Sequence, residues 1–314
     1  MPQEIQKIII DCDVGVDDAL ALILAFHSPE LEVLAVTAVN GNVPLDLVVP
    51  NIKRVLTLIR PIHPPLFAPG ADRPLRGHTL YSHSVHGETG LGNARIDFNE
   101  EEKHWRLYPG RAEELLPHLA RQEPGEITLV AIGPLTNLGL ALQRDPAGMK
   151  QFKKFVVMGG ALGERGNVTP HAEFNFFTDP LAAKMVFEAG VPLTLVPLDA
   201  THQVFLTSQI IEEKILPIHS PFSRFVIDAC QYDPARRRFR HGQPLVYLHD
   251  PLAIGVLIEP CLSQTEKRPL TIEAQEGEQW GKVLEGVPGS PMVDVCLKVD
   301  AERFINLFIS RFSE

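Results

Sequence analysis

Residues 8–25, IIIDCDVGVDDALALILA, join one apolar run to a second through four aspartates. A continuous apolar run of this kind is typical of a strand covered on both faces of a parallel sheet, and the run after the aspartates has a helical pattern. The aspartates lie between the two runs, at Asp11, Asp13, Asp17 and Asp18. The stretch therefore predicts a strand, a tight turn at Gly15 and a helix, with acidic side chains gathered where the strand ends.

The same alternation continues along the chain. Strand-like apolar runs occupy residues 7–11, 31–39, 126–133, 152–160, 191–199 and 244–250, and helical patterns occupy 17–26, 134–143 and 179–190. This order predicts an α/β protein with a mostly parallel central sheet flanked by helices. In such sheets ligands bind beyond the carboxyl ends of the strands. Residues 62–110, rich in Pro, His and Gly, are predicted to cross over these ends. We expect residues 1–314 to form a single domain.

Composition narrows the function classes. The chain has 314 residues, of which 45% are hydrophobic, and a formal net charge of -10, which argues against a nucleic-acid partner. No apolar run reaches the length of a membrane span, and the start lacks a signal-peptide pattern. The cysteines are scattered without a CxxC pair, which predicts neither a disulfide framework nor a thiolate zinc site. We expect a cytoplasmic protein that acts on a small polar substrate and has no membrane partner.

The four aspartates need an explanation beyond helix capping. Capping accounts for one or two acidic residues at a helix start, and Asp11 and Asp13, two positions apart, should point the same way. Two like charges about 4 Å apart cost about 4 kcal/mol at an effective dielectric of about 20. No Lys or Arg lies between Lys7 and Lys53. The cluster thus requires a bound cation, raised pKa values or a distant basic group, and oxygen ligands without His or Cys favour Ca²⁺ or Mg²⁺.

Other polar residues follow the apolar runs, where the sheet argument predicts a site. Thr136 is expected to lie in a turn at a helix start, with its carbonyl available to a hard cation. Asp179 is interpreted as a helix cap before Pro180. Asp250 could be either a cap or a site residue, because the neighbouring His249 could donate a proton. The stretches concerned are VNGNV (39–43), AIGPLTNL (131–138), GNVTPHAEFN (166–175) and LHDPLAI (248–254).

Taken together, these stretches resemble the inosine-uridine-preferring nucleoside hydrolases. The resemblance rests on DCDVGVDDALAL, GN at 41–42, HGETGLG at 86–92, IGPLTNL, MGG, GNVTPHAEFN, LDATHQV at 198–204 and LHDPLAI, in the order of that family. It implies a Rossmann-like nucleoside hydrolase fold and hydrolysis of the N-glycosidic bond of ribonucleosides to free base and ribose. It also implies one Ca²⁺ per subunit, a homodimer or homotetramer, and a pyrimidine-preferring or nonspecific enzyme acting on uridine, cytidine or inosine.

The resemblance also implies roles for individual residues. Asp13 would be the general base for the attacking water, Asp11 would orient the other carboxylates, and His249 would protonate the leaving base, with His86 near that base. Tyr232, Arg237 and Arg238 are candidates for the base-side wall. The metal would be held by Asp13, Asp18, the carbonyl of Thr136 and Asp250. The ribose would be bound by Asp17, Asn42, Met158, Asn167, Glu173 and Asn175.

Two alternatives remain open at this point. The stretch at Asp11 also looks like the DxDx[TV] loop of the haloacid-dehalogenase phosphatases, in which Asp11 would be a nucleophile and Asp13 an acid/base, with Mg²⁺ as cofactor. The doubled Asp17-Asp18 and the missing downstream Lys and acidic pair disfavour this phosphohydrolase. The second alternative is a non-catalytic binder of ribose or nucleosides. The presence of both a candidate base and a candidate acid argues against it.

Overall fold

The computed structural model describes residues 5–77, 79–92, 94–97, 103–230 and 243–312. Ten of its strands form one sheet in the order β11-β10-β12-β7-β6-β5-β1-β2-β3-β4. The strands are β1 Gln6–Cys12, β2 Leu31–Ala38, β3 Leu66–Pro69, β4 Arg106–Leu107, β5 Ile127–Ala131, β6 Lys154–Met158, β7 Leu193–Val196, β10 Ser263–Ile272, β11 Val283–Glu285 and β12 Met292–Val299.

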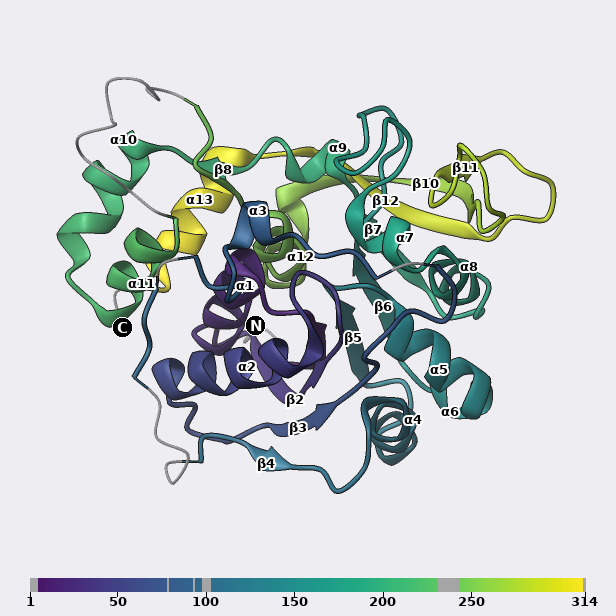
Figure 1. The fold of residues 1–314 in the computed structure, drawn as a ribbon, viewed down its shortest axis with the longest axis horizontal. Coiled ribbons are helices and arrows are strands. Elements are labelled where there is room, and N and C mark those ends of the chain that lie inside the picture. The colour runs from purple at the N-terminus through teal and green to yellow at the C-terminus, as the bar shows by residue number, and fades with distance from the viewer. Residues whose placement is uncertain (1–4, 78, 93, 98–102, 231–242, 313–314) are drawn as a thin grey trace.

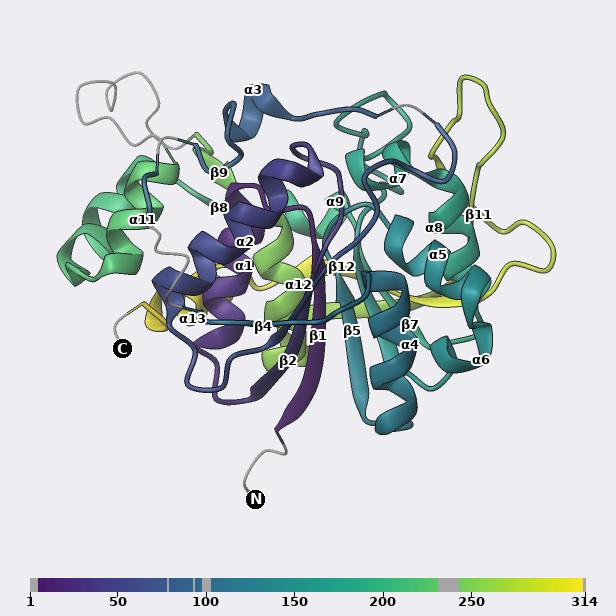
Figure 2. The ribbon, with the colours of Figure 1, turned by 60° about the horizontal axis from the view of Figure 1, so that its bottom comes forward.

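The sheet is mostly parallel, as predicted. From β12 to β4 every neighbouring pair is parallel, and only β10 runs antiparallel to both of its neighbours. β1 lies between β5 and β2 near the middle of the sheet. In Figure 2 it runs up from the N-terminus, and the short helix α3 (His83–His86) lies at the opposite end of the molecule.

Helices cover both faces of the sheet (Figures 1 and 2). Along β1, Ile8, Ile10 and Cys12 belong to one apolar core and Ile9 to the other, which is the two-residue period of a strand. The first core is covered by α1 Val16–Phe26, α2 Leu45–Ile59, α11 Pro221–Ala229, α12 His249–Ile258 and α13 Ala301–Ser310. The second is covered by α4 Ala112–Gln122, α5 Thr136–Arg144, α6 Pro146–Met149 and α8 Pro180–Phe187.

The strand predicted at 244–250 forms only in part, and the prediction that it belongs to the main sheet was wrong. Only β9 (Val246–Tyr247) is extended there, and it pairs antiparallel with β8 (Phe205–Leu206) in a separate two-stranded sheet. The place beside β7 is taken by β12 from the end of the chain, with Val295 opposite Leu195. The long crossing predicted at 62–110 also contributes two strands, β3 and β4, that extend the main sheet.

The remaining helical segments are short. None of the helices in the described ranges is long and apolar enough to cross a membrane. The short segments are α7 Phe174–Thr178, α9 Leu198–Thr201, α10 Ser208–Ile210, the π-turn Ile211–Ile215, and the 3₁₀ turns Leu216–Ile218 and Pro260–Leu262.

Candidate active site

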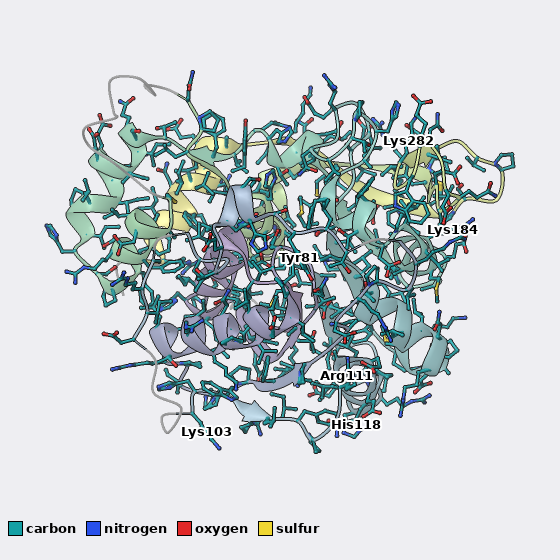
Figure 3. The ribbon with its side chains drawn as sticks, in the orientation of Figure 1. Tyr81, Lys103, Arg111, His118, Lys184 and Lys282 are labelled. Atoms are coloured by element: carbon teal, nitrogen blue, oxygen red, sulfur yellow. The ribbon has the colours of Figure 1, made fainter. Side chains whose placement is uncertain are left out.

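A cavity of about 490 Å³ lies at the carboxyl ends of the parallel strands, beside α3. Figure 3 shows Tyr81, just before α3, near the centre of this view of the molecule. The cavity brings together sequence-predicted residues from separate parts of the chain, namely Asp17, Asn42, His86, Met158, Asn167, Glu173, Asn175, His249 and Asp250. Its wall therefore combines the ends of the central strands with α3, β9 and the start of α12.

Three carboxylates converge at this cavity. Asp17, Asp18 and Asp250 each offer an oxygen, and these oxygens lie within 4.8 Å of one another. Asp17 and Asp18 come from the first turn of α1, and Asp250 comes from the first turn of α12. Asp250, predicted to share a metal with Asp13 and Asp18, lies beside Asp17 and Asp18 in the structure, because α12 packs directly on α1.

Asp13 lies against this group. Its backbone N–H donates to Asp18 Oδ1 at 3.1 Å, and its Oδ2 accepts from the backbone N–H of Asn42 at 2.6 Å. Asp13 Oδ1 and Asp17 Oδ1 are buried and have no hydrogen-bond partner among the described residues. Free carboxylate oxygens beside three converging carboxylates are the donor set that a hard divalent cation prefers, so the residues present fit such an ion.

Electrostatics point the same way. Burial raises the pKa of Asp17 and of Asp18 to about 6, and it raises the pKa of Asp13 and of Asp250 well above the usual range. Within the described ranges no Lys or Arg forms an ion pair with these carboxylates. Among the described residues, therefore, no Lys or Arg offsets the negative charge of these carboxylates. A bound cation would reduce their mutual repulsion.

Small residues make room for Asp13. A Cβ at Gly41 would overlap Asp13 Oδ2, and a Cβ at Gly133 would come within 2.8 Å of Asp13 Oδ1. Asn42 follows Gly41, and its side-chain nitrogen donates to Asp18 Oδ2 at 3.1 Å. The turns after β2 and β5 thus hold the Asp13 carboxylate closely from two sides.

Asp11 lies deeper than the other aspartates. It is fully buried and does not line the cavity, and its Oδ1 accepts from Thr37 and, at 2.7 Å, from Asn137. Burial raises its pKa to about 7. A nucleophile must reach the substrate, so this position does not support Asp11 as the attacking group of a phosphohydrolase.

Thr136 begins α5, as expected for a residue at a helix start. Its hydroxyl donates to Asp179 Oδ2 at 2.8 Å. Asp179 also accepts from the backbone N–H of Ala182 at 3.1 Å and caps α8, so the capping interpretation of Asp179 is confirmed. The Thr136 side chain is therefore structural, and only its carbonyl is left for the predicted metal contact.

One wall of the cavity is held together by hydrogen bonds to backbone. Glu173 accepts from the N–H groups of Asn175 at 2.8 Å and Gly160 at 2.9 Å, and burial raises its pKa to about 7. The side-chain nitrogen of Asn175 donates to the Met158 carbonyl at 3.2 Å. Asn167 Oδ1 accepts from the Phe174 N–H at 2.9 Å, which leaves its amide nitrogen for a ligand.

Another wall of the cavity contains His86 and His249. His86 Nδ1 accepts from the Val16 N–H at 3.0 Å and lies 3.8 Å from Asp17 Oδ1, and burial lowers its pKa to about 4. Burial also lowers the pKa of His249 to about 3, so its imidazole is neutral at pH 7. The ring of His249 stacks on Tyr247 with centroids 5.4 Å apart.

Some residues of this wall were not assigned from the sequence. His202 lines the cavity with its ring centroid 5.7 Å from that of His249, and Thr201 is hydrogen-bonded to His249. Both lie in LDATHQV (198–204), a stretch that carries the family resemblance but implies no role for either residue. The candidates Tyr232, Arg237 and Arg238 lie outside the described residues.

Comparison with known proteins gives a consistent result. A family model described as "Inosine-uridine preferring nucleoside hydrolase" matches residues 8–306. The chain is 35% identical to the "Pyrimidine-specific ribonucleoside hydrolase RihA" of Enterobacter sp. (strain 638), over 98% of this chain and 97% of that one. It is 36% identical to the protein of the same name from Salmonella schwarzengrund (strain CVM19633), over 97% of each chain.

Solved structures agree with these sequence matches. A plant nucleoside hydrolase, PpNRh1, superposes with a TM-score of 0.87 at 32% identity, covering 98% of this chain and 99% of that one. A purine-preferring ribonucleoside hydrolase from Gardnerella vaginalis superposes with a TM-score of 0.87 at 29% identity, covering 98% of both chains. The likeness therefore extends over nearly the whole chain.

Proposed function

Since this chain belongs to the inosine-uridine-preferring nucleoside hydrolase family and is a ribonucleoside N-glycosidase, we propose that its preferred substrates are pyrimidine ribonucleosides, uridine and cytidine. The relatives named pyrimidine-specific, at 35% and 36% identity, support this preference. Family membership removes the phosphohydrolase and the non-catalytic binder as readings of the chain.

The metal centre is part of the proposal. Asp13, Asp18 and Asp250, with the Thr136 carbonyl, would hold one Ca²⁺ per subunit, and Asp17 lies close enough to share in it. The converging carboxylates and the unpartnered oxygens of Asp13 and Asp17 support this assignment. When bound, the ion supplies positive charge that keeps the carboxylates ionised and makes a neighbouring water more acidic.

Asp13 is the proposed general base. It takes a proton from the water that attacks the anomeric carbon C1′ of the ribose, and its free Oδ1 supports this role. As the C1′–N bond stretches, positive charge grows on the ribosyl ring, and nearby carboxylates stabilise that charge. Asp17, Asn42, Met158, Asn167, Glu173 and Asn175 would bind the sugar, while Asp11 orients Asp13 and its neighbours from behind.

His249 is the proposed partner of the departing base. The bond electrons move onto the base, and the ring of His249 donates a hydrogen bond to that negative charge. The family resemblance implies that His249 protonates the base, but burial lowers the pKa of His249, so we propose a neutral imidazole that donates a hydrogen bond. The base then takes its final proton from solvent. His86 would contact the base from α3.

The observation that carries the proposal is the meeting of Asp250 with Asp17 and Asp18 at a cavity that His249 also lines. Release of ribose is the direct test, measured as reducing sugar from uridine, cytidine, inosine and adenosine in the presence of Ca²⁺. We expect turnover of the pyrimidine nucleosides to exceed that of the purines. D13N should abolish turnover, whereas D46N, an exposed change on α2, should not. Faster release from inosine than from uridine would overturn the pyrimidine preference.

Assembly, location and domain organisation complete the proposal. We expect a homodimer or homotetramer in the cytoplasm, built from one catalytic domain spanning residues 1–314. The single sheet that joins β1 near the amino end to β12 near the carboxyl end supports one domain. Sedimentation equilibrium of the calcium-loaded protein would test the subunit number, and a monomer would contradict it.

A further inference from the structure

Thr201 is fully buried at the end of α9, and its hydroxyl lies 2.7 Å from Nδ1 of His249. This is the one hydrogen bond of the Thr201 side chain found in the part of the chain that the structure describes. α9 contacts α12, whose first residue is His249. The contact therefore joins a residue outside the cavity to the residue proposed to assist departure of the base.

Two ring contacts fix the plane of the His249 imidazole. Tyr247 stacks on it with an interplanar angle of 29°, and His202 lies at 58° with centroids 5.7 Å apart. These contacts leave open which edge of the ring is presented to the cavity. The hydrogen bond to Thr201 decides this, because it occupies Nδ1.

The other ring nitrogen is then left for a ligand. Nε2 of His249 has no hydrogen-bond partner among the described residues, and His249 lines the cavity together with Asp17 and Asp250. In an imidazole, the hydrogen bond at one nitrogen sets whether the other carries the hydrogen. A threonine hydroxyl can donate to Nδ1, and Nε2 then carries the hydrogen.

We propose that Thr201 is a positioning residue for base departure, whose hydroxyl donates to Nδ1 of His249 and holds Nε2–H towards the base. The inference rests on the proposed role of His249. The C1′–N bond breaks with its electron pair going to the base, the water oxygen bonds to C1′, and Asp13 takes the water proton. The Nε2 hydrogen stays on the imidazole as a hydrogen-bond donor throughout.

The test compares two leaving groups. Uridine releases a poor leaving group that needs this hydrogen bond, whereas 4-nitrophenyl β-D-ribofuranoside releases a stable phenolate that does not. We expect T201V to lower kcat/KM on uridine about tenfold, mainly through kcat, and to change the nitrophenyl riboside less than about twofold. T201S should restore most of the uridine activity. In an H249A background, T201V should not lower kcat/KM on uridine any further, since Thr201 acts through His249.

A matched control removes a threonine hydroxyl elsewhere. Thr57 is buried on α2 and donates to the Lys53 carbonyl at 2.8 Å, so T57V should leave both substrates unchanged. Independently of any variant, ¹⁵N-histidine NMR of the calcium-loaded wild-type protein should show His249 with its hydrogen on Nε2.

Three results would overturn the inference. One is equal loss on both substrates in T201V, which indicates a merely structural role. Another is full uridine activity in T201V together with loss of that activity in H249A. This result would keep the proposed role of His249 and refute only the positioning role of Thr201. The last is a His249 ring that carries its hydrogen on Nδ1. If wild-type protein releases no ribose from uridine, the proposed function itself fails.

Discussion

The side-chain nitrogen of Asn137 donates to Asp11 Oδ1 at 2.7 Å, across 126 positions of sequence. The same nitrogen donates to the Ala38 carbonyl at 3.0 Å, and Asn137 Oδ1 accepts from the Ala71 N–H at 2.7 Å. One buried amide at the start of α5 therefore links β1, the end of β2 and the segment after β3. Asp11, the buried carboxylate inside β1, is held in place by this link.

Removing that amide should destabilise the fold. N137L leaves Asp11 with fewer donors and the Ala71 N–H without its acceptor, so we expect a loss of about 1–3 kcal/mol in the free energy of unfolding, measured by urea titration. Q143L, an exposed change on the same helix, should stay within about 0.5 kcal/mol of wild type. Equal stability of the two variants would contradict the role of Asn137.

Removal of divalent metal should affect activity and stability together. Chelation should abolish ribose release and lower the melting temperature, and Ca²⁺ should restore both. Calcium at about 100 times its Kd would add about 2.7 kcal/mol. D250N should remove this calcium-dependent shift, whereas D46N should retain it.

Calorimetric titration of Ca²⁺ into variants distinguishes the residues that bind the metal from those that bind the sugar. We expect D13N to weaken calcium binding more than D17N, because Asp13 is proposed as a ligand and Asp17 mainly as a sugar contact. A larger effect of D17N would instead assign the ion to the three converging carboxylates of Asp17, Asp18 and Asp250.

Glu173 should give the stability a pH dependence. Its pKa rises from 4.5 to about 7 through burial, so between these values the unfolded chain has lost a proton that the folded chain retains. The contribution of Glu173 to stability is therefore lost as pH rises through this window, by about 3 kcal/mol in total.

Urea titrations of calcium-saturated wild type and E173Q at pH 5 and pH 8 would measure this effect. The advantage of wild type over E173Q should shrink at the higher pH. A difference that stays constant between the two pH values would show that the carboxyl group titrates alike in the folded and unfolded chain.

The proposed sugar contact of Asp17 predicts discrimination against deoxyribose. A site built to hydrogen-bond a hydroxyl strongly rejects the analogue that lacks it. Deoxyuridine should therefore be hydrolysed about 100-fold more slowly than uridine in kcat/KM, and D17A should narrow that ratio. Equal turnover of deoxyuridine and uridine by the wild-type protein would refute the role.

The parallel part of the fold could be predicted because its signals are local. The run before Asp11 and the helical pattern after Asp17 each carry their own period, and both elements formed where expected. The meeting of Asp250 with Asp17 and Asp18 also followed from a general rule, since ligands gather where parallel strands end.

The strand within 244–250 shows what the local sequence pattern does not predict, namely which sheet a strand joins. Val246 and Tyr247 are as compatible with a central strand as with a small one, and their own sequence does not reveal that β12 occupies the place beside β7. Thr201 was missed for a related reason. A buried threonine on a short helix becomes informative only when the tertiary fold brings His249 to it.

The separate sheet formed by β8 and β9 has a consequence for how this scaffold can change. The residues proposed to bind the sugar and metal come mainly from the ends of the large sheet, whereas Tyr247 reaches the cavity from the small one and stacks on His249, the first residue of α12. Remodelling the small sheet could retune nucleobase selectivity through the ring of His249 and leave the carboxylate cluster undisturbed. Libraries aimed at new leaving groups are thus best confined to residues 202–206 and 244–247.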